Sequence, residues 1–241
     1  MERIDNLGPL LSAAAHDPRT LELFGTLVNG PWLRVVNYHN TKRADAPRFE
    51  REVASFQKHF VPVTMELLDE FFATRRWPAA KPGLIPAVFE GWRTNYDVYA
   101  RILDKYGFRG WFYIPAFFPD VPVEEQVDYC PPHGLRLRAR EDYDDPRCCM
   151  TWDEIRDLSA RHEICCHTGS HSPVTPDMTP EEIRREVVDS KRRMEEEIQK
   201  EVSVFCWRGG EEYRRARFAH PYFEEAGYRY VVSNLKLEKI R

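Results

Sequence analysis

The sequence predicts an α/β fold in which a mainly parallel sheet is buried on both faces. Short apolar segments alternate with amphipathic segments of helical period along most of the 241 residues. The apolar segments are apolar at nearly every position, which is typical of strands that helices cover on both sides. Several of them end in histidine or acidic residues, at the sheet edge where α/β proteins usually bind their ligands.

The first half of the chain supplies three expected strands. Residues 32–38 are rich in β-branched and aromatic side chains, residues 83–89 are apolar, and residues 110–118 are rich in aromatic side chains. Between these strands, apolar residues recur at helical spacing. The expected helices are residues 49–60, residues 64–72 with Thr64 as the cap, and residues 95–106.

The second half continues the alternation of helices and strands. The expected elements are a helix over residues 152–161 with Thr151 as its cap, a strand over 163–166, a helix over about 179–201, a strand over 202–207, a further helix, and a strand over 228–233. The helix at 179–201 carries many charges, which we interpret as a solvated face.

The chain divides into an appendage and one domain. Residues 1–31 have a weak helical pattern and are expected to form an N-terminal helical appendage. Residues 32–241 show no internal repeat and no second boundary. Within them, residues 119–150 contain several prolines and little periodicity, so we expect a long insertion of the kind that often carries a functional role.

Composition excludes several classes of function. The 35 basic and 39 acidic residues give a formal net charge of −4, which provides no broad positive field for nucleic acid. No apolar segment approaches the roughly 18 residues that span a bilayer, and the N-terminus has no basic region followed by an apolar run. We therefore expect no nucleic-acid partner, no membrane association and a cytoplasmic location.

Six cysteines form neither a CxxC pair nor a secreted disulfide pattern, so we expect reduced thiols. They are Cys130, Cys148, Cys149, Cys165, Cys166 and Cys206. Only one of Cys165 and Cys166 can face a site, because successive strand residues point to opposite faces. Cys130, Cys148 and Cys149 with His133 form an alternative structural zinc set, although their spacing matches no standard finger. Ordinary loop residues are the simpler interpretation.

The candidate chemistry lies at three strand ends. His39 follows the first strand, Glu90 follows the strand over residues 83–89, and His167 and His171 follow the strand over 163–166. An HxxxH pair in a strand-to-loop segment can bind one divalent ion, with a carboxylate from a neighbouring strand completing an open site. A structural pair or surface histidines are the alternative. His16, His59, His162 and His220 are expected at surface or helix positions.

Five segments resemble the polysaccharide deacetylase (NodB homology) family, in colinear order from residue 32 to residue 241. They are residues 35–60, 88–108, 163–171, 205–213 and 225–233. The resemblance implies a distorted (β/α) barrel, here incomplete at the C-terminal end. It also implies a divalent metal ion, commonly zinc, that is held by one Asp and two His and hydrolyses an N-acetyl amide on a sugar. His167 and His171 match the two metal histidines.

The carboxylate motif departs from that family. The family usually has Phe-Asp-Asp-Gly, with one Asp as general base and one on the metal, whereas this chain has Phe89-Glu90-Gly91. Glu90 is therefore either the third metal ligand or the base. Cys206 occupies the place of the arginine that orients the base, with Arg208 two residues later. The late acidic-Trp and Leu-x-His motifs are missing.

These matches give a set of site residues. We expect Glu90, His39 and Arg208 to be catalytic, and His167, His171 and Glu90 to hold the metal. Trp92, Cys206 and Trp207 are expected to bind substrate. His39 has an equal alternative as a buried, hydrogen-bonded histidine, and a core role is the alternative for each tryptophan.

The resulting functional prediction is a metal-dependent hydrolase that removes an acyl group, in particular N-acetyl, from an amino sugar or a related small N-acylated substrate. Amide hydrolysis needs an activated water, charge stabilisation and a proton for the leaving amine. The shortened carboxylate motif leaves two alternatives open. One is a catalytically silent binding or scaffolding protein, and the other is a repurposed site that acts on a small metabolite.

Overall fold

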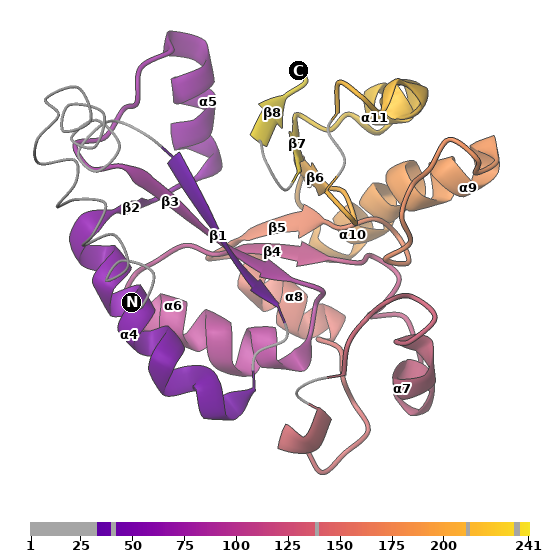
Figure 1. The fold of residues 1–241 in the computed structure, drawn as a ribbon, viewed down its shortest axis with the longest axis horizontal. Helices are drawn as coiled ribbons and strands as arrows, with labels where there is room; N and C mark the ends of the chain where they lie inside the picture. Colours follow the sequence, from indigo (N-terminus) through magenta and orange to yellow (C-terminus); the bar gives the residue numbers. More distant parts are fainter. Residues whose placement is uncertain (1–32, 40–41, 138–139, 211–212, 234–236) are drawn as a thin grey trace, which may run out of the picture.

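The computed structural model describes residues 33–39, 42–137, 140–210, 213–233 and 237–241. The expected helical appendage at residues 1–31 lies outside these ranges. The described residues form an α/β domain with one sheet and helices packed against it (Figure 1). None of the helices among them is long and apolar enough to cross a bilayer.

The sheet has eight strands in the order β1-β3-β4-β5-β6-β7-β8, and β2 pairs with β3 beside this path. All pairings are parallel except that of β7 with β8. The strands are β1 Leu33–His39, β2 Val61–Pro62, β3 Gly83–Phe89, β4 Trp111–Ile114, β5 Glu163–Cys166, β6 Val204–Cys206, β7 Tyr230–Val232 and β8 Leu237–Lys239. Within the described strands no pairing joins β1 to β8, so the curled sheet is an open half-barrel.

Helices connect the parallel strands, as the alternating sequence pattern predicts. They are α4 Ala46–His59, α5 Met65–Thr74, α6 Arg101–Lys105, α7 Gln126–Tyr129, α8 Trp152–Ser159, α9 Pro180–Arg184, α10 Ser190–Ile198 and α11 His220–Ala226. Two π-helical turns, η2 Asn95–Ala100 and η5 Arg185–Asp189, precede α6 and α10 directly. Figure 1 shows α5 on its own near β8, away from α4, α6 and α8.

Side chains alternate between two cores on the two faces of the sheet. Along β4, Trp111 and Tyr113 belong to the inner core with Leu68 of α5, whereas Phe112 and Ile114 belong to the outer core beneath the other helices. The same alternation separates the vicinal cysteines of β5, because Cys165 lies in the inner core and Cys166 in the outer core. The expected α/β class with a sheet buried on both faces is therefore confirmed, as is an incomplete (β/α) barrel.

Local signals placed most element boundaries correctly. Thr64, Thr151 and Thr179 each accept a hydrogen bond from a main-chain N–H of the first helical turn, and the last two form capping boxes. The strand expected over residues 110–118 ends at Ile114, because Pro115 follows and lacks an N–H. The short strands β2 and β8 were not predicted.

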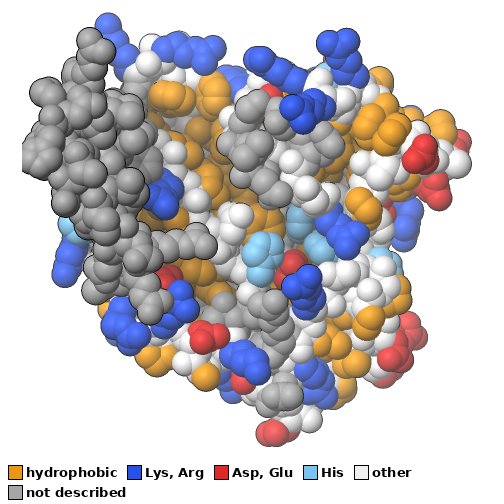
Figure 2. Space-filling model, viewed as in Figure 1, with side chains coloured by type: hydrophobic (Ala, Val, Ile, Leu, Met, Phe, Trp, Pro, Cys, Tyr) orange, Lys and Arg blue, Asp and Glu red, His pale blue; other side chains and the backbone are white. Residues whose placement is uncertain are grey.

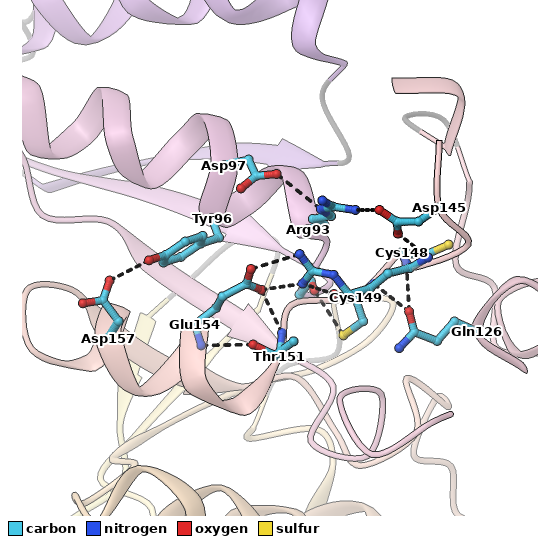
Figure 3. Close-up of polar contacts among 12 residues, drawn as sticks. Arg93, Tyr96, Asp97, Gln126, Asp145, Cys148, Cys149, Thr151, Glu154 and Asp157 are labelled. Atoms are coloured by element: carbon cyan, nitrogen blue, oxygen red, sulfur yellow. Dashed lines mark hydrogen bonds and ion pairs between the residues drawn. The ribbon is translucent and has the colours of Figure 1, made fainter. Parts of the chain in front are cut away.

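The insertion at residues 119–150 is firmly attached to the end of β3. Its last residues form an antiparallel bridge between Cys149 and Trp92. The side-chain oxygen of Gln126 accepts from the main-chain N–H groups of Cys148 and Cys149 at 2.8 and 3.0 Å. Figure 3 shows this arrangement, with Arg93 reaching Asp145 of the insertion. The insertion therefore lies directly beside the residues that follow β3.

Candidate active site

The parallel register brings the expected strand-end residues to one edge of the sheet. His39, the last residue of β1, pairs with Phe89, the last residue of β3. The next residue, Glu90, donates its main-chain N–H to the carbonyl of Tyr113 in β4, and His167 donates likewise to Ile114. Figure 2 shows histidine side chains gathered near the middle of this face, beside an acidic side chain and between basic ones.

Glu90 is held by two hydrogen-bond donors. His39 Nδ1 lies 3.1 Å from Oε1, and the indole Nε1 of Trp92 donates to Oε2 at 2.7 Å. Although burial acts to raise the pKa of Glu90, these two hydrogen bonds and the nearby histidines lower it below its usual value. Glu90 is therefore ionised at neutral pH and can only accept, so His39 Nδ1 carries the proton.

The imidazole of His39 is fixed yet accessible. It stacks on Phe89 with ring centroids 4.5 Å apart, and its side chain is 50% exposed, compared with 13% for Glu90. Because Nδ1 is engaged by the carboxylate, Nε2 is the ring nitrogen left for other partners, and it has none among the described residues. A carboxylate that orients an imidazole in this way is typical of a general base.

His167 and His171 share one hydrogen-bonding pattern. His167 Nδ1 lies 3.0 Å from the carbonyl oxygen of Cys206, and His171 Nδ1 lies 2.7 Å from that of His133. A carbonyl oxygen can only accept, so each ring carries its proton on Nδ1 and leaves Nε2 bare. The two ring centroids are 4.9 Å apart.

Both rings are neutral at physiological pH. Burial, and to a smaller extent the neighbouring His171, lowers the pKa of His167 to about 3. Burial also lowers the pKa of His171, against the opposing effects of the His133 carbonyl and the charge of Glu90. A neutral imidazole with a bare nitrogen and its other N–H on a carbonyl is the usual form of a metal-binding histidine.

The turn after β3 requires an unusual backbone. Glu90 has φ 77° and Gly91 has φ 67°, so two successive residues lie in the left-handed region. A methyl group on Gly91 would lie only 3.0 Å from Cγ2 of Ile114, which explains the glycine. The non-glycine residue there is strained by about 1 to 3 kcal/mol, and such strain is common at functional sites. The turn directs Glu90 toward His39.

The donor set fits a divalent ion in part. The bare Nε2 atoms of His167 and His171 are suitable ligands, and Nδ1 of each is already held by an outer partner. Glu90 uses both carboxylate oxygens on His39 and Trp92. In the part of the chain that the structure describes, no group of three His, Cys, Asp or Glu is close enough to hold an ion. The role of Glu90 as third ligand stays a prediction.

Arg208 lies at the rim of the site against the insertion. Its guanidinium covers Gly134, where an added methyl group would overlap it. Its positive charge also acts to lower the pKa of His171, so it lies within electrostatic range of that ring. A cation beside the histidine pair could stabilise developing negative charge on a substrate, and its catalytic role stays a prediction.

The three expected substrate-binding residues are buried. Trp92 holds Glu90, and the Cys206 carbonyl holds His167. Trp207 is 2% exposed and packs against Phe205 and Phe223. Burial raises the pKa of the Cys206 thiol, so it is protonated and unreactive. Direct contact between these side chains and a sugar stays a prediction.

Sequence reasoning missed two supporting residues and misplaced one histidine. His133, considered only for a zinc set, orients His171 through its carbonyl. Glu186 lies in the helix whose charges were interpreted as solvated, but it is 2% exposed and bonds to the loop between His167 and His171. His162, expected at a surface or helix position, is 3% exposed. The sequence has no signal that marks His133 as a residue whose main-chain carbonyl orients a ring. The burial of Glu186 could have been suspected, because its neighbours Val187 and Val188 are apolar.

The strand ends of this α/β half-barrel bring a histidine pair and an imidazole–carboxylate pair to one edge of the sheet. The sequence profile for polysaccharide deacetylases matches residues 88–231, and the chain belongs to this family. The resemblance inferred from the sequence is thereby confirmed. Family and fold point to a hydrolase that acts on carbon–nitrogen bonds other than peptide bonds, with carbohydrates as the substrate class.

Solved structures share the fold at low sequence identity. The deacetylase PplD of Streptococcus pyogenes, in complex with acetate, aligns with a TM-score of 0.64 and 11% identity over 87% of this chain and 86% of that one. The deacetylase domain of BpsB from Bordetella bronchiseptica aligns with a TM-score of 0.59 and 14% identity, over 83% of this chain and 88% of that one. A de-N-acetylase from Aggregatibacter actinomycetemcomitans aligns with a TM-score of 0.59 and 16% identity, over 87% of this chain and 89% of that one. No curated protein sequence matches the chain.

Proposed function

We propose that the protein is a metal-dependent N-deacetylase that removes acetyl groups from amino sugars. The observation that carries this proposal is the matched state of His167 and His171, both of which are neutral and have Nδ1 on a carbonyl and Nε2 bare. Two purely structural histidines have no physical reason to leave the same nitrogen without a partner among the described residues.

His167 and His171 would hold the ion, for which zinc is our proposal because it favours imidazole ligands. Such an ion supplies polarisation of the acyl carbonyl and a lowered pKa for the attacking water. Glu90 has both oxygens engaged elsewhere, which favours its alternative role as part of the base. Its negative charge still acts on both histidines.

His39 and Glu90 together supply proton transfer. His39 Nε2 takes a proton from water as the water oxygen attacks the acetyl carbon, and Glu90 stabilises the imidazolium through Nδ1–H. When the carbon–nitrogen bond breaks, the same Nε2 returns that proton to the departing amine. Acetate and a free amino sugar result. Arg208 at the rim is proposed to stabilise the oxyanion or to bind substrate.

The sequence alone is the basis for proposing a particular size of substrate and a location in the cell. A small or precursor N-acylated sugar and a cytoplasmic location are predictions that no contact in the described structure addresses. The half-exposed His39 at the site's entrance is compatible with either a small sugar or the residue of a longer glycan.

The test combines metal content with acetate release. Protein purified without chelator should carry close to one divalent ion per chain and release acetate from N-acetylglucosamine or its short oligomers. His167→Ala and His171→Ala should lose both properties, whereas His59→Ala, an exposed histidine of α4, should lose neither. A parent protein without stoichiometric metal, unchanged by His167→Ala, would contradict the proposal.

One observation favours the silent alternative. The described residues lack a three-member ligand group, and a single carboxylate stands where the family has two. Inserting Asp between Glu90 and Gly91 separates the two functions. Acetate release that appears only in the insertion variant indicates a silent parent, whereas activity already present in the parent excludes it.

A further inference from the structure

We propose that Glu186 is a positioning residue that fixes the loop carrying both metal histidines, here called the histidine loop (residues 167–171). The inference rests on the proposed function, because it assigns the loop its role in metal binding. It goes further in naming a buried carboxylate, on a different element from any strand end, as a determinant of metal affinity.

Glu186 lies in the π-helical turn η5, between α9 and α10. Single π-helical turns within helices are uncommon and often occur at functional sites. The side chain is 3% exposed, and its only ion pair within the described part of the chain is with Arg185, at 3.6 Å and 61% exposed. A carboxylate buried this deeply needs strong hydrogen-bond donors.

The donors all come from the histidine loop. Glu186 Oε2 accepts from the main-chain N–H of Gly169 at 2.9 Å and of Ser170 at 2.8 Å, and Oε1 accepts from the Ser170 hydroxyl at 2.7 Å. Hydrogen bonds to an ionised acceptor are stronger than those between neutral groups. One side chain thus satisfies two buried main-chain donors and one hydroxyl.

The loop needs such fixation because its backbone is strained. Thr168 and His171 both have φ 64°, in the left-handed region that non-glycine residues rarely adopt. The loop's carbonyl groups are fixed on the opposite side, where Thr168 and Gly169 accept from the N–H groups of Ala116 and Phe117 at 3.1 and 2.8 Å. Glu186 holds the N–H side, so the loop is fastened on both sides.

The loop's position determines whether the two rings converge. His167 reaches the carbonyl of Cys206 and His171 reaches that of His133, on two separate elements. Both contacts require the residues between the histidines to keep their tight turn. Release of Gly169 and Ser170 from Glu186 would let His171 rotate away from His167, because its own φ is strained.

The experiment compares Glu186→Ala with Glu186→Gln. Gln keeps one oxygen for the two N–H groups and an amide N–H for the Ser170 hydroxyl, whereas Ala keeps neither. Zinc affinity, measured by competition with a chromophoric chelator, should fall by roughly 10- to 100-fold in Glu186→Ala, as for other outer-shell residues. Glu186→Gln should restore most of it.

Two variants control for charge and for stability. Glu181→Gln removes an exposed carboxylate from α9 and should leave zinc affinity unchanged. Lys191→Met removes the hydrogen bond from Lys191 of α10 to the Val202 carbonyl and the ion pair with Glu195, neither of which involves the histidine loop, and should lower the melting temperature without lowering zinc affinity. If Lys191→Met lowers zinc affinity as much as Glu186→Ala at equal stability, Glu186 has only a structural role.

A metal-independent measurement separates this inference from the proposed function. In metal-free protein, Glu186→Ala should accelerate hydrogen exchange of the Gly169 and Ser170 amides and change the ¹⁵N shifts of the His171 ring. If the parent binds no zinc but these changes occur, the proposed function fails and the positioning role stands. Unchanged exchange and ring shifts in Glu186→Ala would overturn the positioning role, whether or not zinc binds.

Discussion

Strand β5 has a buried histidine before its first residue and another after its last, and the two are held in opposite ways. His162 accepts a hydrogen bond at Nδ1 from the main-chain N–H of Gly110 at 3.1 Å, and its Nε2 lies 3.2 Å from an oxygen of Asp104. His167 instead donates from Nδ1 to a carbonyl and leaves Nε2 bare. Both residues are nearly fully buried, at 3% and 4% exposure.

The difference teaches how to separate structural from functional histidines. At His162 the Nδ1 atom accepts a hydrogen bond, so the ring proton is on Nε2, which faces the Asp104 carboxylate at 3.2 Å without hydrogen-bond geometry. At His167 and His171 the proton is on Nδ1 instead, and among the described residues nothing bonds to Nε2, so two unprotonated nitrogens are available as ligands. Burial is the same at the two ends of β5, and hydrogen-bond direction alone distinguishes them.

The largest expected effect is the difference in activity between a variant that lacks His167 and one that lacks His162. His167→Ala should lower acetate release by about 10³-fold or more, because several kcal/mol of transition-state stabilisation depend on the ion. His162→Leu should leave kcat/KM within a few-fold of the parent. Steady-state acetate assays on both variants check this. Equal losses in the two variants would remove the distinction drawn here.

Glu90 provides the next test. Glu90→Gln should lower kcat by roughly 10²- to 10⁴-fold, because His39 loses the carboxylate that orients it and stabilises its charged form. Metal content should stay at the parent level. Metal analysis and assays of the purified variant measure both, with Glu70→Gln on the exposed side of α5 as the control. Metal loss comparable to that of His167→Ala would instead make Glu90 the third ligand.

His162 should determine part of the pH dependence of stability. Burial, against the opposing charge of Asp104, lowers the pKa of His162 from 6.5 to about 4, with Arg161 and Arg109 acting in the same direction as burial and Asp157 against it. The unfolded chain therefore binds more protons between pH 6.5 and 4, so unfolding becomes easier as the pH falls through this window.

His162→Leu should weaken that dependence. The variant is expected to lose about 1 to 3 kcal/mol of stability at pH 7, because the Gly110 N–H becomes an unsatisfied buried donor. Between pH 6.5 and 4 its stability should fall less steeply than that of the parent. Urea unfolding at several pH values measures both effects, and parallel curves for the two proteins would show that His162 does not titrate in this range.

The smallest expected effect concerns the insertion. Gly134→Ala should lower kcat/KM by about 10-fold, because the methyl group displaces the Arg208 guanidinium from the rim. Gly107→Ala is a matched control, since its φ of 61° is similar to the 66° of Gly134 and no atom lies within 4 Å of its added methyl group. Equal activity of the two variants would exclude a role for Arg208.

Local sequence patterns were sufficient to predict the bounds of elements that depend mainly on their own residues and their immediate neighbours in the chain. The bounds of β3 and β5 match the expected ranges, because both are short apolar segments between clear end signals. Prediction was poorer for β8, which depends on antiparallel pairing with β7, and for the helix over residues 179–201, which η5 interrupts. Neither feature has a local signal.

The sequence by itself determined the α/β class, the family, and the strand ends at which His39, Glu90, His167 and His171 lie. Periodicity, caps and motif spacing act between near neighbours in the chain, so they can be recognised without coordinates. Only the tertiary structure decided that Glu90 bonds to His39 and Trp92, that carbonyls of Cys206 and His133 orient the two rings, and that Glu186 is buried beneath them. These contacts join distant segments through particular atoms, and their direction depends on the packed geometry of the whole sheet.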